Sequence, residues 1–188
     1  MKNLKTIAIA LLLVVSTAVS AQNKKIDVKK SNIEWLGKKV TGQHNGTINF
    51  TEGTLVFKGK TLKGGNFTVD MTSINTTDLE AGKGKEKLDG HLKADDFFGV
   101  EKYPTATLVF KTISGKGKGL YKVTADLTIK DVTEPVTFDI TVKGNTATTS
   151  FKIDRTKFGI KFKSKNFFEN LGDNVIYDDF DLTVNLQF

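Results

Sequence analysis

Residues 123–142 read VTADLTIKDVTEPVTFDITV and contain two runs in which every second residue is apolar. The first run alternates apolar residues from Val123 to Ile129 with threonine and aspartate, and the second does so from Val136 to Val142. Successive side chains of an extended chain point to opposite faces, so this period of two places each apolar set on one face of a sheet. The stretch therefore predicts two β-strands.

The same alternation extends over most of the chain after about residue 26. It predicts further strands around 26–28, 33–35, 48–50, 55–57, 67–71, 105–110, 151–153 and 180–188. Residues that favour tight turns stand at 45–46, 52–53, 58–59, 64–65, 115–119 and 144–145. Eight or more short strands with frequent turns favour an all-β fold, either an antiparallel barrel or a sandwich.

Two stretches depart from this pattern. Between residues 77 and 98 the spacing becomes helical, with Leu88 and Leu92 four residues apart and His91 beside them. We expect one or two short helices there, with the leucines facing inward. The second stretch, residues 158–174, is irregular.

The N-terminus has the order of regions found in a secretory signal peptide. Lys2 and Lys5 precede an apolar run over residues 7–15, and small residues follow, ending at Ala21. The run is shorter than the ~20 residues that a transmembrane helix needs. We therefore predict a cleaved signal peptide over residues 1–21, with the cut before Gln22, and one exported domain over residues 22–188.

The composition excludes several classes of protein. The chain has no cysteine, which rules out disulfides, a lipid-anchored N-terminal cysteine and cysteine-based catalytic or metal sites. The formal charge of +7 comes from scattered lysines, with Arg155 as the one arginine. A nucleic-acid-binding face more often shows clustered arginines with exposed aromatics, so we expect no nucleic-acid partner.

The phenylalanines carry most of the remaining information. Most of the 14 Phe residues fall on the apolar faces of predicted strands. In a closed sheet that face is the barrel interior, and an eight-stranded barrel either fills its interior with side chains or encloses one ligand. The residues alone leave a packed core and a ligand cavity equally open.

A small outer-membrane β-barrel is an alternative, because alternation alone does not say which face is the interior. Membrane barrels carry aromatic girdles at both interfaces, whereas this chain has three Tyr and one Trp. The predicted helix in mid-chain also favours a barrel outside the membrane.

Catalytic signals are weak. His91 and Asp95 are four residues apart and would share a helix face, which suits a general base or a pair of metal ligands. A site needs at least three converging groups, so a cap or a loop hydrogen bond is the plainer interpretation. The sequence indicates no metal and no cofactor.

Three motifs between residues 87 and 160 resemble those of the YceI-like polyisoprenoid-binding family. They are KLDGHLKADDFF at 87–98 followed by EKYPTAT at 101–107, LTIKDVTEPV at 127–136, and DRTKFGI at 154–160. The family pattern usually has Gly at the position of Asp131, commonly Lys at Glu134 and often Asp at Lys157. The last two differences reverse a charge near loops, and the first adds a Cβ to a turn.

The resemblance implies an extended, lipocalin-like antiparallel barrel of eight strands in the bacterial periplasm. It implies binding of a polyisoprenoid or similar amphiphilic lipid in the barrel cavity, with no established catalysis. An enzyme acting on an isoprenoid or quinone-like substrate through His91 and Asp95 stays as an alternative, and pairing of two copies into a homodimer stays open.

On this basis we expect a set of inward-facing apolar residues to contact the lipid tail: Trp35, Phe50, Phe67, Met71, Phe110, Leu127, Ile129, Phe138 and Phe158. The head group could meet His44 or Arg155, because a guanidinium group binds phosphate oxygens through paired hydrogen bonds. A structural ion pair between Arg155 and Asp154, or a loop carboxylate, is at least as well supported.

Overall fold

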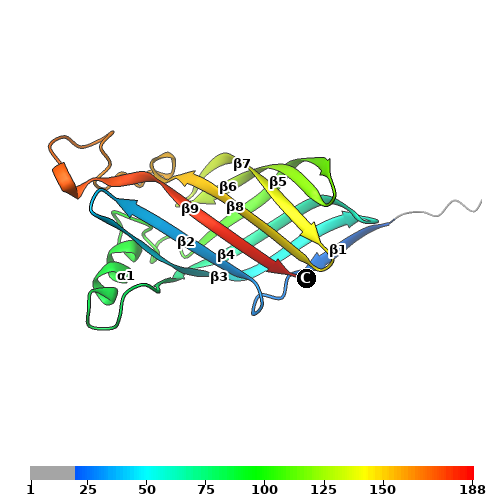
Figure 1. The fold of residues 1–188 in the computed structure, drawn as a ribbon, viewed down its shortest axis with the longest axis horizontal. Helices are drawn as coiled ribbons and strands as arrows, with labels where there is room; N and C mark the ends of the chain where they lie inside the picture. The colour runs from blue at the N-terminus through cyan, green and yellow to red at the C-terminus, as the bar shows by residue number, and fades with distance from the viewer. Residues whose placement is uncertain (1–19) are drawn as a thin grey trace, which may run out of the picture.

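The computed structural model describes residues 20–188. Nine strands and one α-helix make up most of it (Figure 1). The strands are β1 (Ala21–Lys25), β2 (Asn32–Lys39), β3 (Gly42–Lys58), β4 (Thr61–Thr76), β5 (Thr105–Gly117), β6 (Leu120–Ile129), β7 (Val132–Lys143), β8 (Thr146–Asp154) and β9 (Ile176–Gln187). The predicted signal peptide lies outside the described residues, apart from Ser20 and Ala21.

Eight of these strands close into an antiparallel barrel, as the family resemblance implied. The order around the barrel is β2-β9-β8-β7-β6-β5-β4-β3, and β3 pairs with β2 to complete the ring. β3 is long enough to serve two neighbours, because its first part pairs with β2 and its last part, Thr54–Lys58, pairs with β1. β1 is thus a ninth strand laid along one end of the barrel.

The alternation in the sequence becomes an apolar interior and a polar exterior. On β6, Val123 and Ala125 are fully buried while Asp126 faces outward, where its Oδ2 lies 3.3 Å from Lys111 Nζ. A barrel wall that faces lipid has the opposite polarity, with an apolar band outside. Within residues 20–188, we find no helix that is both long and apolar enough to cross a bilayer.

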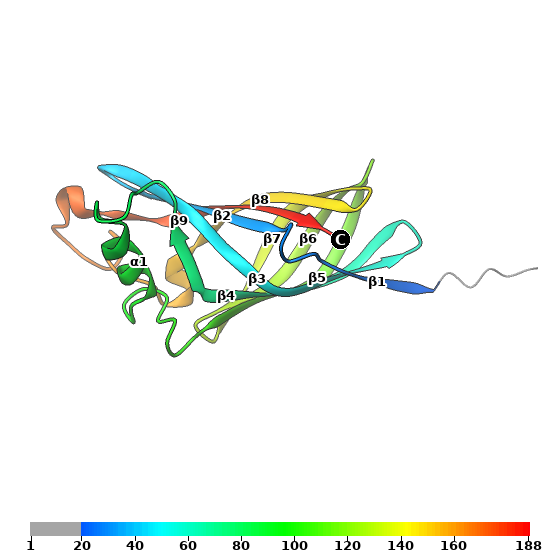
Figure 2. The same cartoon turned by 90° about the horizontal axis from the view of Figure 1, so that it is seen from below.

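The two ends of the barrel are built differently (Figures 1 and 2). We call one the sealed end, formed by the turns at 59–60, 118–119 and 144–145 and by residues 26–31. We call the other the mouth, formed by the turns at 40–41 and 130–131 and by the long connections 77–104 and 155–175. The mouth connections carry α1 (Lys85–Lys93) and the 3₁₀ helices η1 (Arg155–Phe158) and η2 (Gly172–Asn174).

The helix predicted between residues 77 and 98 is confirmed, but it is short. α1 ends at Lys93, and Ala94 is already extended with ψ of 163°. Asp95 therefore lies beyond the helix, and the prediction that it shares a helix face with His91 is wrong. Leu92 is buried, as its spacing predicted.

Three predicted turns are wrong, because their glycines lie inside strands. Those at 45–46 and 52–53 belong to β3, and the one at 64–65 belongs to β4. A Cβ on Gly46 would lie 2.6 Å from the ring of Trp35, and one on Gly65 would lie 2.8 Å from the ring of Phe110. These glycines serve close packing of aromatic rings rather than chain reversal.

The strand predicted around 26–28 is also displaced, since β1 ends at Lys25. Residues 26–31 instead cross the sealed end. Ile26 N donates to Gly53 O at 3.0 Å, and Asp27 N donates to Gln187 O at 2.7 Å. The N-terminal segment thereby joins β3 to the C-terminal strand.

Candidate functional site

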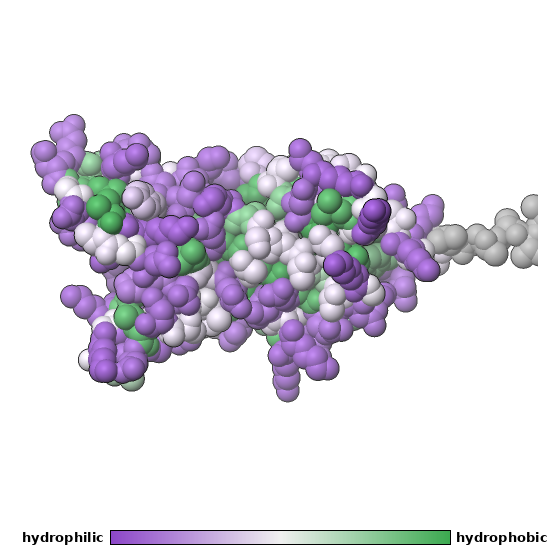
Figure 3. Space-filling view, in the orientation of Figure 1, coloured by the Kyte–Doolittle hydropathy of each residue, from purple (hydrophilic) through white to green (hydrophobic). Residues whose placement is uncertain are grey.

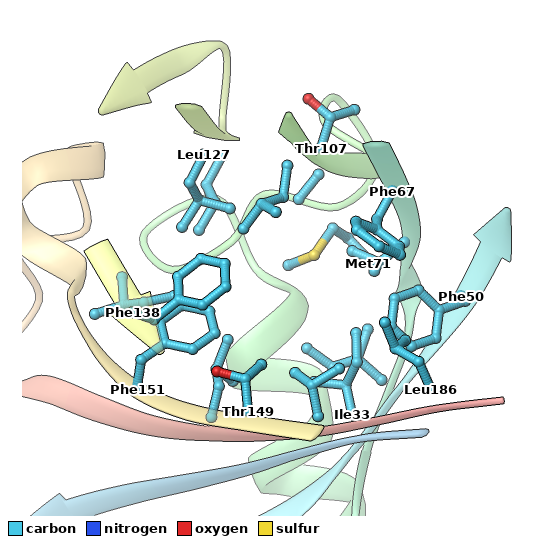
Figure 4. A pocket seen from close by; sticks show the side chains of 18 of the residues that line it. Ile33, Phe50, Phe67, Met71, Thr107, Leu127, Phe138, Thr149, Phe151 and Leu186 are labelled. Carbon is cyan, nitrogen blue, oxygen red and sulfur yellow. The ribbon is translucent and has the colours of Figure 1, made fainter. Parts of the chain in front are cut away.

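An apolar cavity of about 110 Å³ lies inside the barrel (Figure 4). All barrel strands contribute to its lining: Ile33, Ile48, Phe50, Phe67, Val69, Met71, Phe98, Ala106, Thr107, Leu108, Phe110, Leu127, Ile129, Phe138, Ile140, Thr149, Phe151, Ile153, Phe180, Leu182, Val184 and Leu186. Two threonines are its only polar members. The interior is therefore not fully packed, and it offers few polar partners to water. Such a space suits an apolar group.

Most of the predicted tail contacts line this cavity. Seven of the nine do so: Phe50, Phe67, Met71, Phe110, Leu127, Ile129 and Phe138. Sequence reasoning left out Phe98, Phe151 and Phe180. Phe151 and Phe180 stand on apolar strand faces and could have been found by the same alternation. Phe98 lies on the connection after α1, where no period points to the interior.

The aromatic rings form a connected wall. Phe67 lies 6.1 Å from Phe50 and 5.7 Å from Phe110, between ring centroids. Phe138 lies 5.9 Å from Phe110 and stacks on Phe151 at 4.6 Å with an 18° interplanar angle. Rings at these separations stabilise one another beyond the area that they bury. The wall shapes the cavity through contacts between neighbouring strands.

Trp35 and Phe158 lie elsewhere. Phe158 is 1% exposed in η1 and belongs to the core at the mouth, packed where β8 has ended and β7 and β8 no longer pair. Its prediction as a cavity residue is wrong because η1 leaves the barrel wall. Trp35 lines two further spaces, which lie between the cavity and the mouth.

These two spaces lie between the cavity and the outside. The first, a channel of about 70 Å³, shares Ile48, Phe98 and Phe180 with the barrel cavity. The second, a cleft of about 630 Å³ at the mouth, shares Trp35, Leu92, Phe97 and other residues with the channel. Figure 3 shows the mouth as a notch between two lobes. Neighbouring spaces share lining residues, so cavity, channel and cleft follow one another from the barrel interior to the mouth, and we call this series the path.

In the part of the chain that the structure describes, charged side chains are absent from the lining of the barrel cavity and belong to the channel and the cleft. The cleft is lined by His44, His91, Lys39, Lys87 and Lys163, among others. His44 Nδ1 lies 3.0 Å from Asp78 Oδ2. Trp35 Nε1 is buried, and no acceptor among residues 20–188 lies within hydrogen-bonding distance of it. The path is therefore apolar inside and offers donors and cations near its opening.

Arg155 is a structural residue. It is 2% exposed, and its guanidinium group donates to Ile160 O at 2.7 Å, Ile176 O at 3.0 Å and Tyr177 O at 3.2 Å. Nη2 also lies 3.4 Å from Asp178 Oδ1. Burial lowers the pKa of Arg155, while Asp178 and Asp154 oppose that effect. These internal partners give Arg155 the structural ion-pair role, here with Asp178. Arg155 also lines the channel, and its head-group role stays a prediction.

The motif around Arg155 has a local structural cause. Asp154 Oδ1 accepts hydrogen bonds from Thr156 N at 2.9 Å and Thr156 Oγ1 at 2.6 Å, which caps η1. Gly159 ends η1 with φ of 76°, a conformation that favours glycine. The other two motifs form α1 with its following turn and the β6–β7 hairpin. All three meet at the mouth.

His91 packs between aromatic rings and does not pair with Asp95. Its ring packs edge-on to Phe97 and Phe162, at 5.5 and 4.5 Å between centroids. Its nearest carboxylate is Asp96, with Nδ1 and Oδ1 3.9 Å apart, rather than the predicted Asp95. Among residues 20–188, no three His, Asp or Glu side chains converge as metal ligands would.

A closed antiparallel barrel with an apolar interior that opens at one end defines a lipocalin-like barrel. The chain matches the YceI-like domain family over residues 25–188 and belongs to that family.

Curated relatives match over part of their length. A UPF0312 protein of Shewanella denitrificans is 30% identical over 131 residues, which are 66% of this chain and 64% of that protein. Protein YceI of Escherichia coli O17:K52:H18 is 34% identical over 101 residues, 53% of this chain and 49% of that protein. The chain thus spans between about half and two thirds of these relatives.

Solved structures share the fold. BcnA of Burkholderia cenocepacia aligns with a TM-score of 0.68 at 23% identity, covering 86% of this chain and 98% of that one. A polyisoprenoid binding domain from Saccharophagus degradans aligns with a TM-score of 0.57 at 16% identity, covering 86% and 95%. At these identities the likeness concerns the architecture.

Proposed function

We propose that this protein binds the apolar tail of a polyisoprenoid or a similar amphiphilic lipid inside its barrel, without chemical conversion. The observation that carries the proposal is the path from an apolar cavity to a polar cleft, since an amphiphile has the same order of parts. The solved Saccharophagus degradans domain with this fold is described as polyisoprenoid binding, which supports the same ligand class.

The size of the cavity limits how the ligand enters. An apolar cavity of about 150 Å³ admits one benzene ring, and the barrel cavity measures about 110 Å³. A long isoprenoid tail therefore requires side chains to rotate away. Phe98, Phe110, Phe151 and Phe180 are the aromatic lining residues that are only partly buried. We propose that these rings move as the tail enters from the channel.

The head group would stay near the cleft. Trp35 Nε1 is a buried donor on the wall shared by the channel and the cleft. A head-group oxygen that accepts from this N–H would satisfy a donor that otherwise costs free energy when buried. His44 lines the same cleft, so it keeps the head-group role that the sequence predicted, as part of this proposal.

The compartment proposed is the periplasm, where the predicted signal peptide would deliver the chain. There a barrel that shields an apolar tail from water could carry or sequester it. The outward polarity of the strands disfavours the alternative of a membrane barrel. The packing of His91 between two aromatic rings disfavours the enzyme alternative.

Organic extraction of the purified protein followed by mass spectrometry tests the proposal. We expect an isoprenoid or related amphiphile to be recovered from the wild-type protein. Ala106→Phe places a ring in the cavity. Overpacking of this kind lowers the free energy of unfolding by about 1–3 kcal/mol, so we expect the variant to fold. It should retain at least ~10-fold less lipid, because excluding the tail removes more than the ~1.4 kcal/mol of binding free energy that corresponds to a tenfold change in affinity. Val109→Phe is the matched control, because Val109 lies on the same strand and is 44% exposed.

If Ala106→Phe does not fold, Leu108→Phe provides a smaller increase in volume at a neighbouring lining position. Recovery of no lipid from wild type, or equal recovery from wild type and the cavity variants, contradicts binding in the barrel.

A further inference from the structure

Two adjacent phenylalanines are displayed at the mouth on an anchored turn. Phe167 and Phe168 are each 48% exposed. Their backbone N–H groups donate to Ser164 O at 3.1 and 3.0 Å, and Ser164 itself is fully buried. The turn is tied to the barrel by Asn166 Nδ2, which donates to Asp178 Oδ2 at 2.6 Å. The rings are therefore held outward by the fold.

Other exposed apolar side chains lie at the same end. Val40, at the tip of the β2–β3 hairpin, is 48% exposed, and Val40 N donates to Val175 O at 3.1 Å. Tyr177, at the start of β9, is 46% exposed. Exposed apolar groups gathered at one place mark interaction surfaces more often than scattered ones do. The mouth thus has an apolar rim.

Lysines accompany this rim. Lys161 Nζ lies 4.6 Å from the ring centroid of Phe167, and Lys163 Nζ lies 5.4 Å from that of Phe162. Lys165 is exposed on the same turn, and Lys39 and Lys87 line the cleft beside it. Glu169 and Asp173 are the acids of the same connection, fewer than its lysines. Aromatic residues flanked by lysines suit the interface of an anionic bilayer, which takes the rings and attracts the cations.

We propose that the mouth docks on the surface of an anionic lipid bilayer through Phe167 and Phe168, with the neighbouring lysines contacting the head groups. This docking would place the cleft against the membrane, so that a lipid passes between bilayer and cavity without crossing water. The inference rests on the proposed function for its purpose, but the docking surface is separate from the cavity. It is peripheral contact and involves no membrane-spanning segment.

Flotation of the purified protein with vesicles tests the docking. We expect binding to vesicles of equal parts phosphatidylglycerol and phosphatidylcholine, weaker binding to phosphatidylcholine alone, and weaker binding in ~500 mM than in ~50 mM salt. The variant Phe167→Ser/Phe168→Ser should bind the anionic vesicles about 10- to 100-fold more weakly, since each ring withdrawn from the interface loses roughly tenfold.

The matched control is Val28→Ser/Val109→Ser, which changes two apolar residues that are 37% and 44% exposed away from the mouth. We expect it to bind vesicles like wild type. Ala106→Phe should also bind them, because the cavity is not needed for docking. Loss of lipid in Ala106→Phe with vesicle binding intact separates the two proposals.

Two results would overturn the docking proposal. One is equal vesicle binding by wild type and Phe167→Ser/Phe168→Ser, or no binding by either. The other is self-association of wild type in the absence of vesicles, seen by sedimentation and abolished in the double variant, which would assign the rim to a second copy of the chain.

Discussion

The two ends of the barrel are stabilised by different interactions, apolar packing at the sealed end and hydrogen bonds from cationic side chains at the mouth. At the sealed end, two-residue turns join the strands and the interior is filled with buried apolar residues such as Leu55, Leu62 and Val123. Phe57 and Phe188 pack at 5.7 Å with Lys24 Nζ over both rings. Regular strands satisfy their own backbone groups, so apolar packing is sufficient there.

At the mouth, three cationic side chains bind backbone carbonyls. Lys85 Nζ donates to Thr76 O at 2.7 Å, and Lys130 Nζ donates to Asp95 O and Phe97 O at 2.8 and 2.9 Å. Arg155 donates to three further carbonyls. Long irregular connections leave carbonyls without ladder partners, and long cationic side chains can reach them. The mouth is thereby ordered without being filled, which leaves room for the channel and cleft.

The largest expected effect of a single change at the mouth is that of Arg155→Met. It leaves three carbonyls without their donor and the Asp178 carboxylate without its cationic partner, so we expect the free energy of unfolding to fall by about 3–5 kcal/mol. Urea denaturation measures it. Leu55→Ala at the sealed end should cost about 2–5 kcal/mol through a cavity alone. If Arg155→Met lost lipid binding with stability unchanged, Arg155 would be a head-group ligand after all.

A smaller effect is expected where α1 is tied to β4. Asp89 accepts hydrogen bonds from Lys85 Nζ and from Thr76 N, both at 2.7 Å. Burial raises the pKa of Asp89, but the hydrogen bonds from Lys85 and Thr76 outweigh it and hold the pKa below the usual 3.8. Asp89→Asn should lower the free energy of unfolding by about 2 kcal/mol at neutral pH.

The pH dependence of this effect has a definite sign. A carboxylate with a lowered pKa in the folded state stabilises fully above its unfolded value, and loses that contribution as pH falls through the folded pKa. The difference between wild type and Asp89→Asn should therefore shrink below about pH 3.8. Hydrogen exchange of Asp89→Asn should be faster in α1 at the mouth and unchanged around Val123 at the sealed end. Equal acceleration at both places would contradict the view that the two ends are stabilised independently.

The smallest expected effect concerns the turns. The sealed-end turns place glycine at positive φ, with Gly59 at 60°, Gly119 at 79° and Gly144 at 58°, whereas the β6–β7 turn at the mouth holds Asp131 at 59°. Asp131→Gly removes this strain, and we expect a gain of about 0.5 kcal/mol after the entropy that glycine loses on folding. Thermal denaturation measures it. Gly119→Ala, whose Cβ would meet Val142 O, should destabilise.

Much of the fold could be predicted from the sequence. Period two located most strands and helical spacing located α1, because both patterns reflect which side chains are buried and which face solvent. The turn predictions failed at Gly46, Gly53 and Gly65, since a sequence does not distinguish a glycine that reverses the chain from one that lies under an aromatic ring. Seven of nine predicted tail contacts line the cavity, because alternation carries over directly from strand to barrel.

The sequence by itself determined the strands, the family and the apolar character of one strand face. Only the tertiary structure decided that this face is the interior, that the rings leave a cavity, and that Arg155 holds the mouth. Alternation does not say which face of a strand is the interior, and it does not determine how wide the closed barrel is. The carbonyls that bind Arg155 come partly from Ile176 and Tyr177, on the next strand beyond a long connection, so their meeting depends on the closed barrel.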